Sequence, residues 1–69
     1  MNNTEFMKWI RNNNIEKHVV IKVKRYEDIA FRYGFVEYLD KNNFIFRDIH
    51  NDTTYRINYS DIMKLEKFE

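Results

Sequence analysis

The pattern of apolar and polar residues changes its period once along the chain, near position 19. Before that position, Phe6, Trp9 and Ile10 recur at spacings of three and four, which is the stripe of a short amphipathic helix. We expect Thr4 to cap its first turn, because a threonine hydroxyl accepts hydrogen bonds from free backbone donors. The asparagines at 12–14 should end it, since asparagine tolerates the left-handed conformation of a C-terminal cap. A helix this short is stable only when it docks on the rest of the domain, and we expect Trp9 to be its main contact.

From position 19 onward the period is two, which is typical of half-buried strands. Turn-forming residues separate the apolar runs, with a single helical turn expected at 60–61. The expected strands lie at about 19–26, 29–39, 44–49, 54–59 and 63–68. Short strands joined by tight turns predict a small closed barrel. The predicted fold class is therefore mainly β (α+β), one domain with a short N-terminal helix in 1–14 and a five-stranded antiparallel barrel in 15–69.

The second predicted strand breaks the alternation that a half-buried strand should show. Phe31, Tyr33 and Phe35 share one parity, whereas Val36 and Tyr38 have the other. If Val36 faces the core, Phe35 points away from it. Three alternatives would cover the outward aromatic side chains: the N-terminal helix, an identical subunit or a different protein. The helix needs nothing outside the chain, but one short helix is too small to cover all of them.

Gly34 lies inside the same strand and is the only glycine of the chain. Glycine in a strand interior weakens the strand and commonly marks a bulge or a sharp bend. We expect it to bend the long second strand at a corner of the barrel, where a bulge would also reset the parity.

Two segments carry a resemblance to known families. The stretch Gly34–Asp40 resembles the first motif of Sm-like proteins: a glycine, an apolar residue two positions later and an aspartate six positions later. The stretch Arg56–Glu66 resembles YolD-like proteins and other SH3-like barrels, in which a short turn introduces the last strand. Together the resemblances imply an SH3-like/Sm-like small barrel over 19–66 and make nucleic-acid binding one expected function.

The composition argues against most kinds of enzyme. A chain with one glycine has no phosphate-binding glycine loop, and Ser60, its one serine, has no nucleophile motif around it. His18 and His50 would have to converge with Asp48 or Asp52 to form a metal or catalytic site, and we expect them to be exposed instead. There is no cysteine for a thiolate site. We therefore expect no catalysis, no metal, no cofactor and no small-molecule substrate.

The charge is nearly balanced, at a formal net +1. Positions 1–35 hold seven basic and four acidic residues, whereas positions 36–69 hold five and seven. One basic concentration with an aromatic neighbour stands out, made of Lys17, Lys22, Lys24, Arg25 and Tyr26. Basic residues interleaved with an aromatic ring could follow a phosphate backbone and stack on a base. The alternative is a solvated strand face whose charges prevent edge pairing.

These observations favour a small binding module over an enzyme. The expected protein-interaction residues are Phe31, Tyr33, Phe35 and Ile45, for binding another protein or for self-association. Nucleic-acid binding is the alternative. No apolar run approaches the roughly 18 residues of a membrane span, so we expect no membrane and a cytoplasmic location. Abundant Asn, Ile, Lys, Phe and Tyr, all with AT-rich codons, suggest an accessory protein of a bacterium or a phage.

Overall fold

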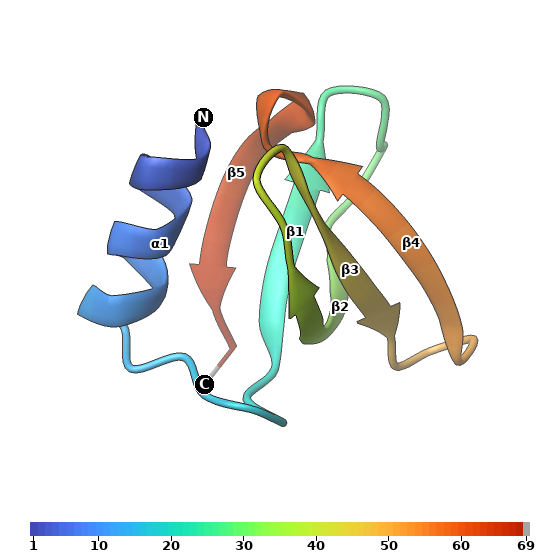
Figure 1. Cartoon of the computed structure of the whole chain (residues 1–69). Helices are drawn as coiled ribbons and strands as arrows, with labels where there is room; N and C mark the ends of the chain where they lie inside the picture. The colour runs from blue at the N-terminus through green and yellow to red at the C-terminus, as the bar shows by residue number, and fades with distance from the viewer. Residues whose placement is uncertain (69) are drawn as a thin grey trace.

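The computed structural model describes residues 1–68 and shows one helix followed by an antiparallel sheet of five strands (Figure 1). The elements are α1 (Asn3–Asn12), β1 (Ile21–Arg25), β2 (Arg32–Leu39), β3 (Asn43–Asp48), β4 (Thr53–Asn58), the 3-10 turn η1 (Tyr59–Asp61) and β5 (Ile62–Lys67). Their order across the sheet is β4-β3-β2-β1-β5. Among the described residues, no helix is long and apolar enough to cross a membrane.

The helix begins two residues earlier than the sequence predicted. Asn2, not Thr4, is the N-cap: its side chain accepts a hydrogen bond from the Glu5 backbone N–H at 2.9 Å, and the Glu5 carboxylate accepts one from Asn2 N–H. This reciprocal pair is a capping box, which satisfies two backbone donors at once and outcompetes a lone hydroxyl. At the other end Asn13 caps the helix, and Asn14 is left-handed with φ 54°, as the asparagine run predicted.

The core lies between the helix and one face of the sheet. Its members are at most 4% exposed: Phe6, Ile21, Val23, Phe44, Phe46, Ile57, Tyr59 and Ile62. The Phe6 ring stacks on Phe44 with centroids 4.6 Å apart and lies 5.0 Å from the Tyr59 ring. Phe6 is thus the docking residue of the helix. The prediction of docking through Trp9 is confirmed in part: Trp9 packs against this cluster but is only partly buried, whereas Phe6 is fully buried.

One of the three alternatives was that the helix covers the outward aromatic side chains of β2. The structure excludes it. The helix packs on the opposite, core-facing side of the sheet, because the apolar cluster there offers Phe6 a fully buried site. Tyr59, expected in the fourth strand, instead begins η1, and its hydroxyl donates to the Asp40 carbonyl at 2.7 Å.

A β-bulge in β2 explains the broken alternation. Val36 lies opposite Phe46 of β3, but Tyr38 lies opposite Ile45, so Glu37 has no partner residue. One unpaired residue shifts the parity of everything after it. The prediction of a bulge at Gly34 was wrong: Gly34 sits in regular register between Ile21 and Asp48.

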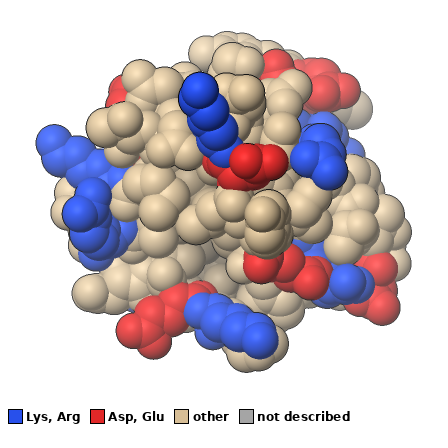
Figure 2. All heavy atoms as spheres, in the orientation of Figure 1, with Lys and Arg blue, Asp and Glu red and all other residues tan. Residues whose placement is uncertain are grey.

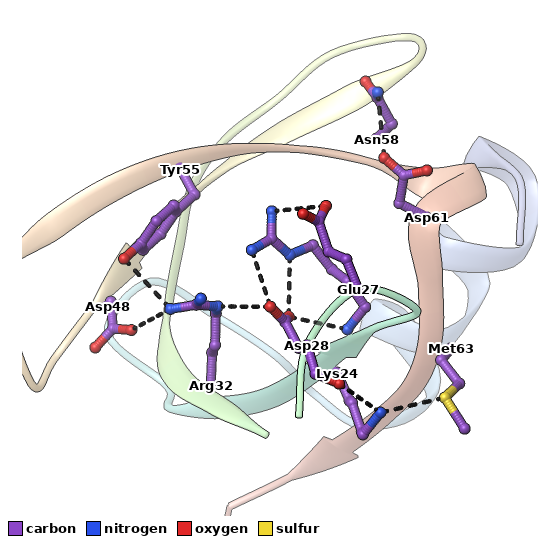
Figure 3. Close-up of polar contacts among 10 residues, drawn as sticks. Lys24, Glu27, Asp28, Arg32, Asp48, Tyr55, Asn58, Asp61 and Met63 are labelled. Carbon is purple, nitrogen blue, oxygen red and sulfur yellow. Dashed lines mark hydrogen bonds and ion pairs between the residues drawn. The ribbon is translucent and has the colours of Figure 1, made fainter. Parts of the chain in front are cut away.

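The sheet is curled but not closed, so the predicted closed barrel is corrected to an open five-stranded sheet. Within residues 1–68, β4 pairs with β3 and β5 pairs with β1, and the two do not pair with each other. Charged side chains lie between them: Asp28 and Arg32 lie between β4 and β5 (Figure 3), and Arg25 is ion-paired with Asp28. Buried charges need partners of their own, and Arg25 and Arg32 both donate to the Asp28 carboxylate.

Candidate protein-interaction surface

The outward face of the sheet brings together the four residues predicted for protein interaction. In β2, Tyr33 and Phe35 alternate with the buried Gly34 and therefore point away from the core. Ile45 of β3 alternates with buried Phe44 and Phe46 and shares that face. We call Phe31, Tyr33, Phe35 and Ile45 the outer aromatic face.

Lys22 of β1 lies beside Phe31 and Tyr33 of the outer aromatic face. Lys22 pairs with Tyr33 across the β1–β2 ladder. Its Nζ lies 4.8 Å from the ring centroid of Phe31 and 5.7 Å from the ring centroid of Tyr33. Such cation–π contacts stabilise an exposed ring by about 0.5–1 kcal/mol. They fix the ring positions before any partner binds.

Neighbouring rings touch this face only by their edges. Tyr33 has His50 at 5.6 Å and Phe68 at 5.5 Å, and His18 lies 5.8 Å from Phe35, all in edge-on geometry. The two histidines therefore do not converge, because each packs against a different ring of β2. In the described part of the chain, no three His, Cys, Asp or Glu side chains gather as metal ligands. Phe31, Tyr33 and Phe35 of the outer aromatic face remain partly accessible to solvent.

A hollow of about 280 Å³ opens beside Phe35. It is lined by Lys17, His18, Phe35, Val36, Glu37 and Arg47. Arg47 crosses its rim, where it is hydrogen-bonded to Glu37 and also donates to Asp52 at 2.9 Å. The hollow gives this end of the outer aromatic face a shape that a partner side chain can fill.

The loop between β1 and β2 extends the exposed apolar surface. Ile29 at its tip is 99% exposed and Tyr26 is 71% exposed. The loop is nevertheless held in place by Asp28, whose side chain is 5% exposed and pairs with Arg25 and Arg32; we call these three residues the clamp. The Asp28 carboxylate accepts two hydrogen bonds from the Arg25 guanidinium, each at 3.0 Å, and one from Arg32 Nε at 3.2 Å (Figure 3). An ordered loop presents Ile29 to a partner with little loss of conformational entropy.

The pKa of Asp28 reflects two opposed effects. Burial raises it, but the hydrogen bonds from Arg25 and Arg32 favour the charged carboxylate more strongly and hold the pKa at about 2, below the ordinary 3.8. The same pairing raises the pKa of Arg25. Asp28 is therefore ionised throughout the physiological range, and the loop stays clamped.

We expect the domain to lose the stability that ionised Asp28 contributes when the pH becomes acidic. The pKa of Asp28 is lower in the folded than in the unfolded chain, so the unfolded chain binds more protons as the pH falls below about 3.8. The clamp's contribution, about 2 kcal/mol, is complete above that pH and is lost as the pH falls through about 2. Urea unfolding of the wild type and Asp28→Asn between pH 6 and pH 2 should show the larger pH dependence in the wild type. Glu16→Gln, which removes an exposed carboxylate outside this cluster, should keep the wild-type profile; equal profiles for all three proteins would contradict the clamp.

The structure does not assemble the five residues predicted for nucleic-acid contact into one surface. Lys22 pairs with Glu66 at 3.1 Å, Lys24 donates to the Asp28 carbonyl, and Arg25 turns to the other face of the sheet. Lys17 lies in the segment before β1, and Tyr26 lies in the β1–β2 loop at the other end of that strand. In the view of Figure 2, basic and acidic side chains are interspersed rather than gathered by sign.

Sequence reasoning missed two features of this surface. Phe68 was not singled out, although it shares the parity of Lys64 and Glu66 on the outward side of the fifth strand. The clamp could also have been predicted from the sequence, because Asp28 lies three residues after Arg25 and four residues before Arg32.

Comparison with known proteins adds no further constraint: no protein-family model, curated protein or solved structure matches the chain. The Sm-like and YolD-like resemblances therefore remain predictions from short motifs.

Proposed function

We propose that this chain is a non-enzymatic protein-binding module that acts through the outer aromatic face. The observation that carries the proposal is that α1 packs on the opposite side of the sheet, which leaves the rings of Phe31, Tyr33 and Phe35 partly accessible on the outward face. Clustered exposed rings commonly mark interaction sites, and aromatic anchors contribute much of the binding energy at interfaces. Ile29 on its clamped loop adds an apolar contact nearby.

We further propose that the domain is related to the SH3-like/Sm-like small barrels and serves as an accessory protein in the cytoplasm of a bacterium or phage-infected cell. The 3-10 turn that introduces the last strand supports the first part of this proposal. The absence of cysteine from the sequence supports a reducing compartment.

Nucleic-acid binding is the second candidate, because Lys22 lies over two rings of the outer aromatic face. A base could stack beside a cation in this way. Phosphate contacts release counterions, so such binding must weaken steeply with salt. Titration of labelled single-stranded DNA and RNA from 50 to 300 mM NaCl separates the two functions, since burial of apolar rings in a protein depends little on salt.

Phe35→Ala is expected to abolish partner capture while the domain stays folded. Phe35 is outside the core cluster, so its removal costs the fold little, whereas truncating an aromatic anchor costs about 2 kcal/mol or more in binding, roughly thirtyfold in affinity. The measurement is a pull-down from the native host, followed by binding of the purified partner and sedimentation of the free chain, with circular dichroism as the check on folding.

Met63→Ala is the matched control, because Met63 is an exposed apolar residue of β5. It should retain the partner. Loss of structure in Phe35→Ala would place this ring in the core, and unchanged affinity with intact structure would remove β2 from the functional surface.

A further inference from the structure

One side of β2 lacks a neighbouring strand over its second half. β1 contributes only Ile21–Val23 to the ladder with β2, and the pairing ends at Gly34, although β2 continues to Leu39. The chain before β1 turns away because His18 is left-handed, with φ 72°, and Val19 N–H bonds back to the Glu16 carbonyl. The place where an extended β1 would lie beside 35–39 is left open.

The backbone of β2 presents free hydrogen-bonding groups to that open place. The Tyr33 carbonyl accepts from Ile49 N–H and so points to the β3 side. Peptide groups alternate along a strand, so Gly34 and Val36 point to the other side. On that side Gly34 pairs with Ile21 of β1. Val36 has no backbone partner on that side within residues 1–68.

Two hollows flank this edge, one on each face of the sheet. The hollow of about 280 Å³ lies on the outer side, next to Phe35 and His18. A second hollow, of about 370 Å³, lies on the side of the helix. Its apolar lining comes from Ile10, Ile15, Val36 and Leu39, and Glu16, Lys17, Glu37 and Tyr38 complete it. Lys17, Val36 and Glu37 line both hollows, so the two meet at the free edge.

We propose that the free edge of β2 at 35–39 binds an extended segment of another protein, which adds as a further strand. Successive side chains of an added strand point to opposite faces, so they would enter the two hollows in turn. Backbone pairing with β2 supplies affinity, and the two hollows supply specificity. The proposal rests on the protein-binding function above and names the chemistry of the partner.

The lining of the hollows specifies the side chains of that segment. Ile10, Ile15 and Leu39 on the helix side require an apolar side chain. On the outer side, Lys17 has no ion pair among the described residues, whereas the carboxylate of Glu37 is already paired with Arg47. In the outer hollow the uncompensated charge is therefore positive, so the side chain that enters this hollow is acidic. The bound segment therefore alternates apolar and acidic residues.

The test is a titration of the ¹⁵N-labelled full chain with a blocked heptapeptide alternating valine and aspartate. Amide shifts should be saturable and concentrated at 15–18 and 35–39. Two other heptapeptides should bind at least tenfold more weakly: one with lysine for aspartate, and one N-methylated at the amides that would face β2. No saturable shift, shifts centred elsewhere, or equal binding of the N-methylated peptide would overturn the proposal.

Variants of the chain provide the matched comparison. Lys17→Glu should weaken binding of the valine–aspartate peptide about tenfold, and Lys64→Glu, the same charge change on β5, about twofold or less. A second copy of the chain is the other candidate occupant of the edge, and sedimentation of the free chain tests for it. A dimer whose formation protects the Val36 amide would mean that a second copy fills the edge, which also overturns the proposal. A host partner still captured through Phe35 while the peptides fail would leave the protein-binding function standing and remove the edge alone.

Discussion

Phe6→Ala should destabilise the domain by about 3–5 kcal/mol, which is the usual cost of removing a buried aromatic side chain. The ring is 0% exposed and stacks on Phe44, so its removal leaves a cavity between the helix and the sheet. A 69-residue chain without disulfides is expected to have a stability near the lower end of the 5–15 kcal/mol range. We therefore expect Phe6→Ala to be largely unfolded at 37 °C, as measured by circular dichroism during thermal and urea unfolding.

Two helix variants test whether the effect belongs to Phe6 itself. Trp9→Ala should cost clearly less, because Trp9 is only partly buried, and Lys8→Ala on the exposed side should change the unfolding free energy by less than about 0.5 kcal/mol. A larger loss for Trp9→Ala than for Phe6→Ala would show that Trp9, and not Phe6, is the main contact between the helix and the sheet.

Strands and helix were predictable wherever one face is apolar along the whole element. Phe44, Phe46 and Ile57 alternate with residues that are not buried, and the third and fourth strands were placed within one or two residues of their observed bounds. Burial of one face imposes a period of two on such strands. The asparagine run similarly marked the end of the helix, because its effect is local.

Features that depend on contacts between distant segments were not predictable in this way. The bulge at Glu37 exists only relative to β3, and a single strand gives no sign of which residue will lack a partner. The side of the sheet to which the helix docks depends on the cluster formed by Phe44 and Tyr59, some forty or fifty residues later. Alternation alone also did not indicate that β4 and β5 stay unpaired, with Arg25 and Arg32 both turned toward Asp28.

The candidate site shows the same division. Parity placed Phe35 on the outward side, conditional on an inward Val36, and the structure confirms both orientations. The basic cluster near Lys22 and Arg25 is close in sequence, but adjacent strand residues point to opposite faces, and most of its charges find partners. Proximity along a strand is therefore a poor guide to a shared surface.

Gly34→Ala and Gly34→Val should both destabilise the domain severely, at or above the upper end of the about 1–3 kcal/mol that overpacking costs. A Cβ atom at this position would lie 2.0 Å from the Arg47 carbonyl oxygen and 2.8 Å from a ring atom of Phe46. The oxygen belongs to the β3 backbone, so relief requires the two central strands to separate. Gly34 does not have a positive φ, so space rather than backbone conformation explains the glycine.

The comparison between the two variants identifies the cause. If the first added carbon makes the clash, Gly34→Ala should already produce most of the loss seen with Gly34→Val, despite the higher strand propensity of valine. Ala30→Val, which adds the same two methyl groups at an exposed position of the β1–β2 loop, should stay within about 0.5 kcal/mol of the wild type. Urea unfolding monitored by circular dichroism measures all three. A fully stable Gly34→Ala would mean that β2 and β3 are farther apart than the structure places them, and that the strand tolerates a side chain at its centre.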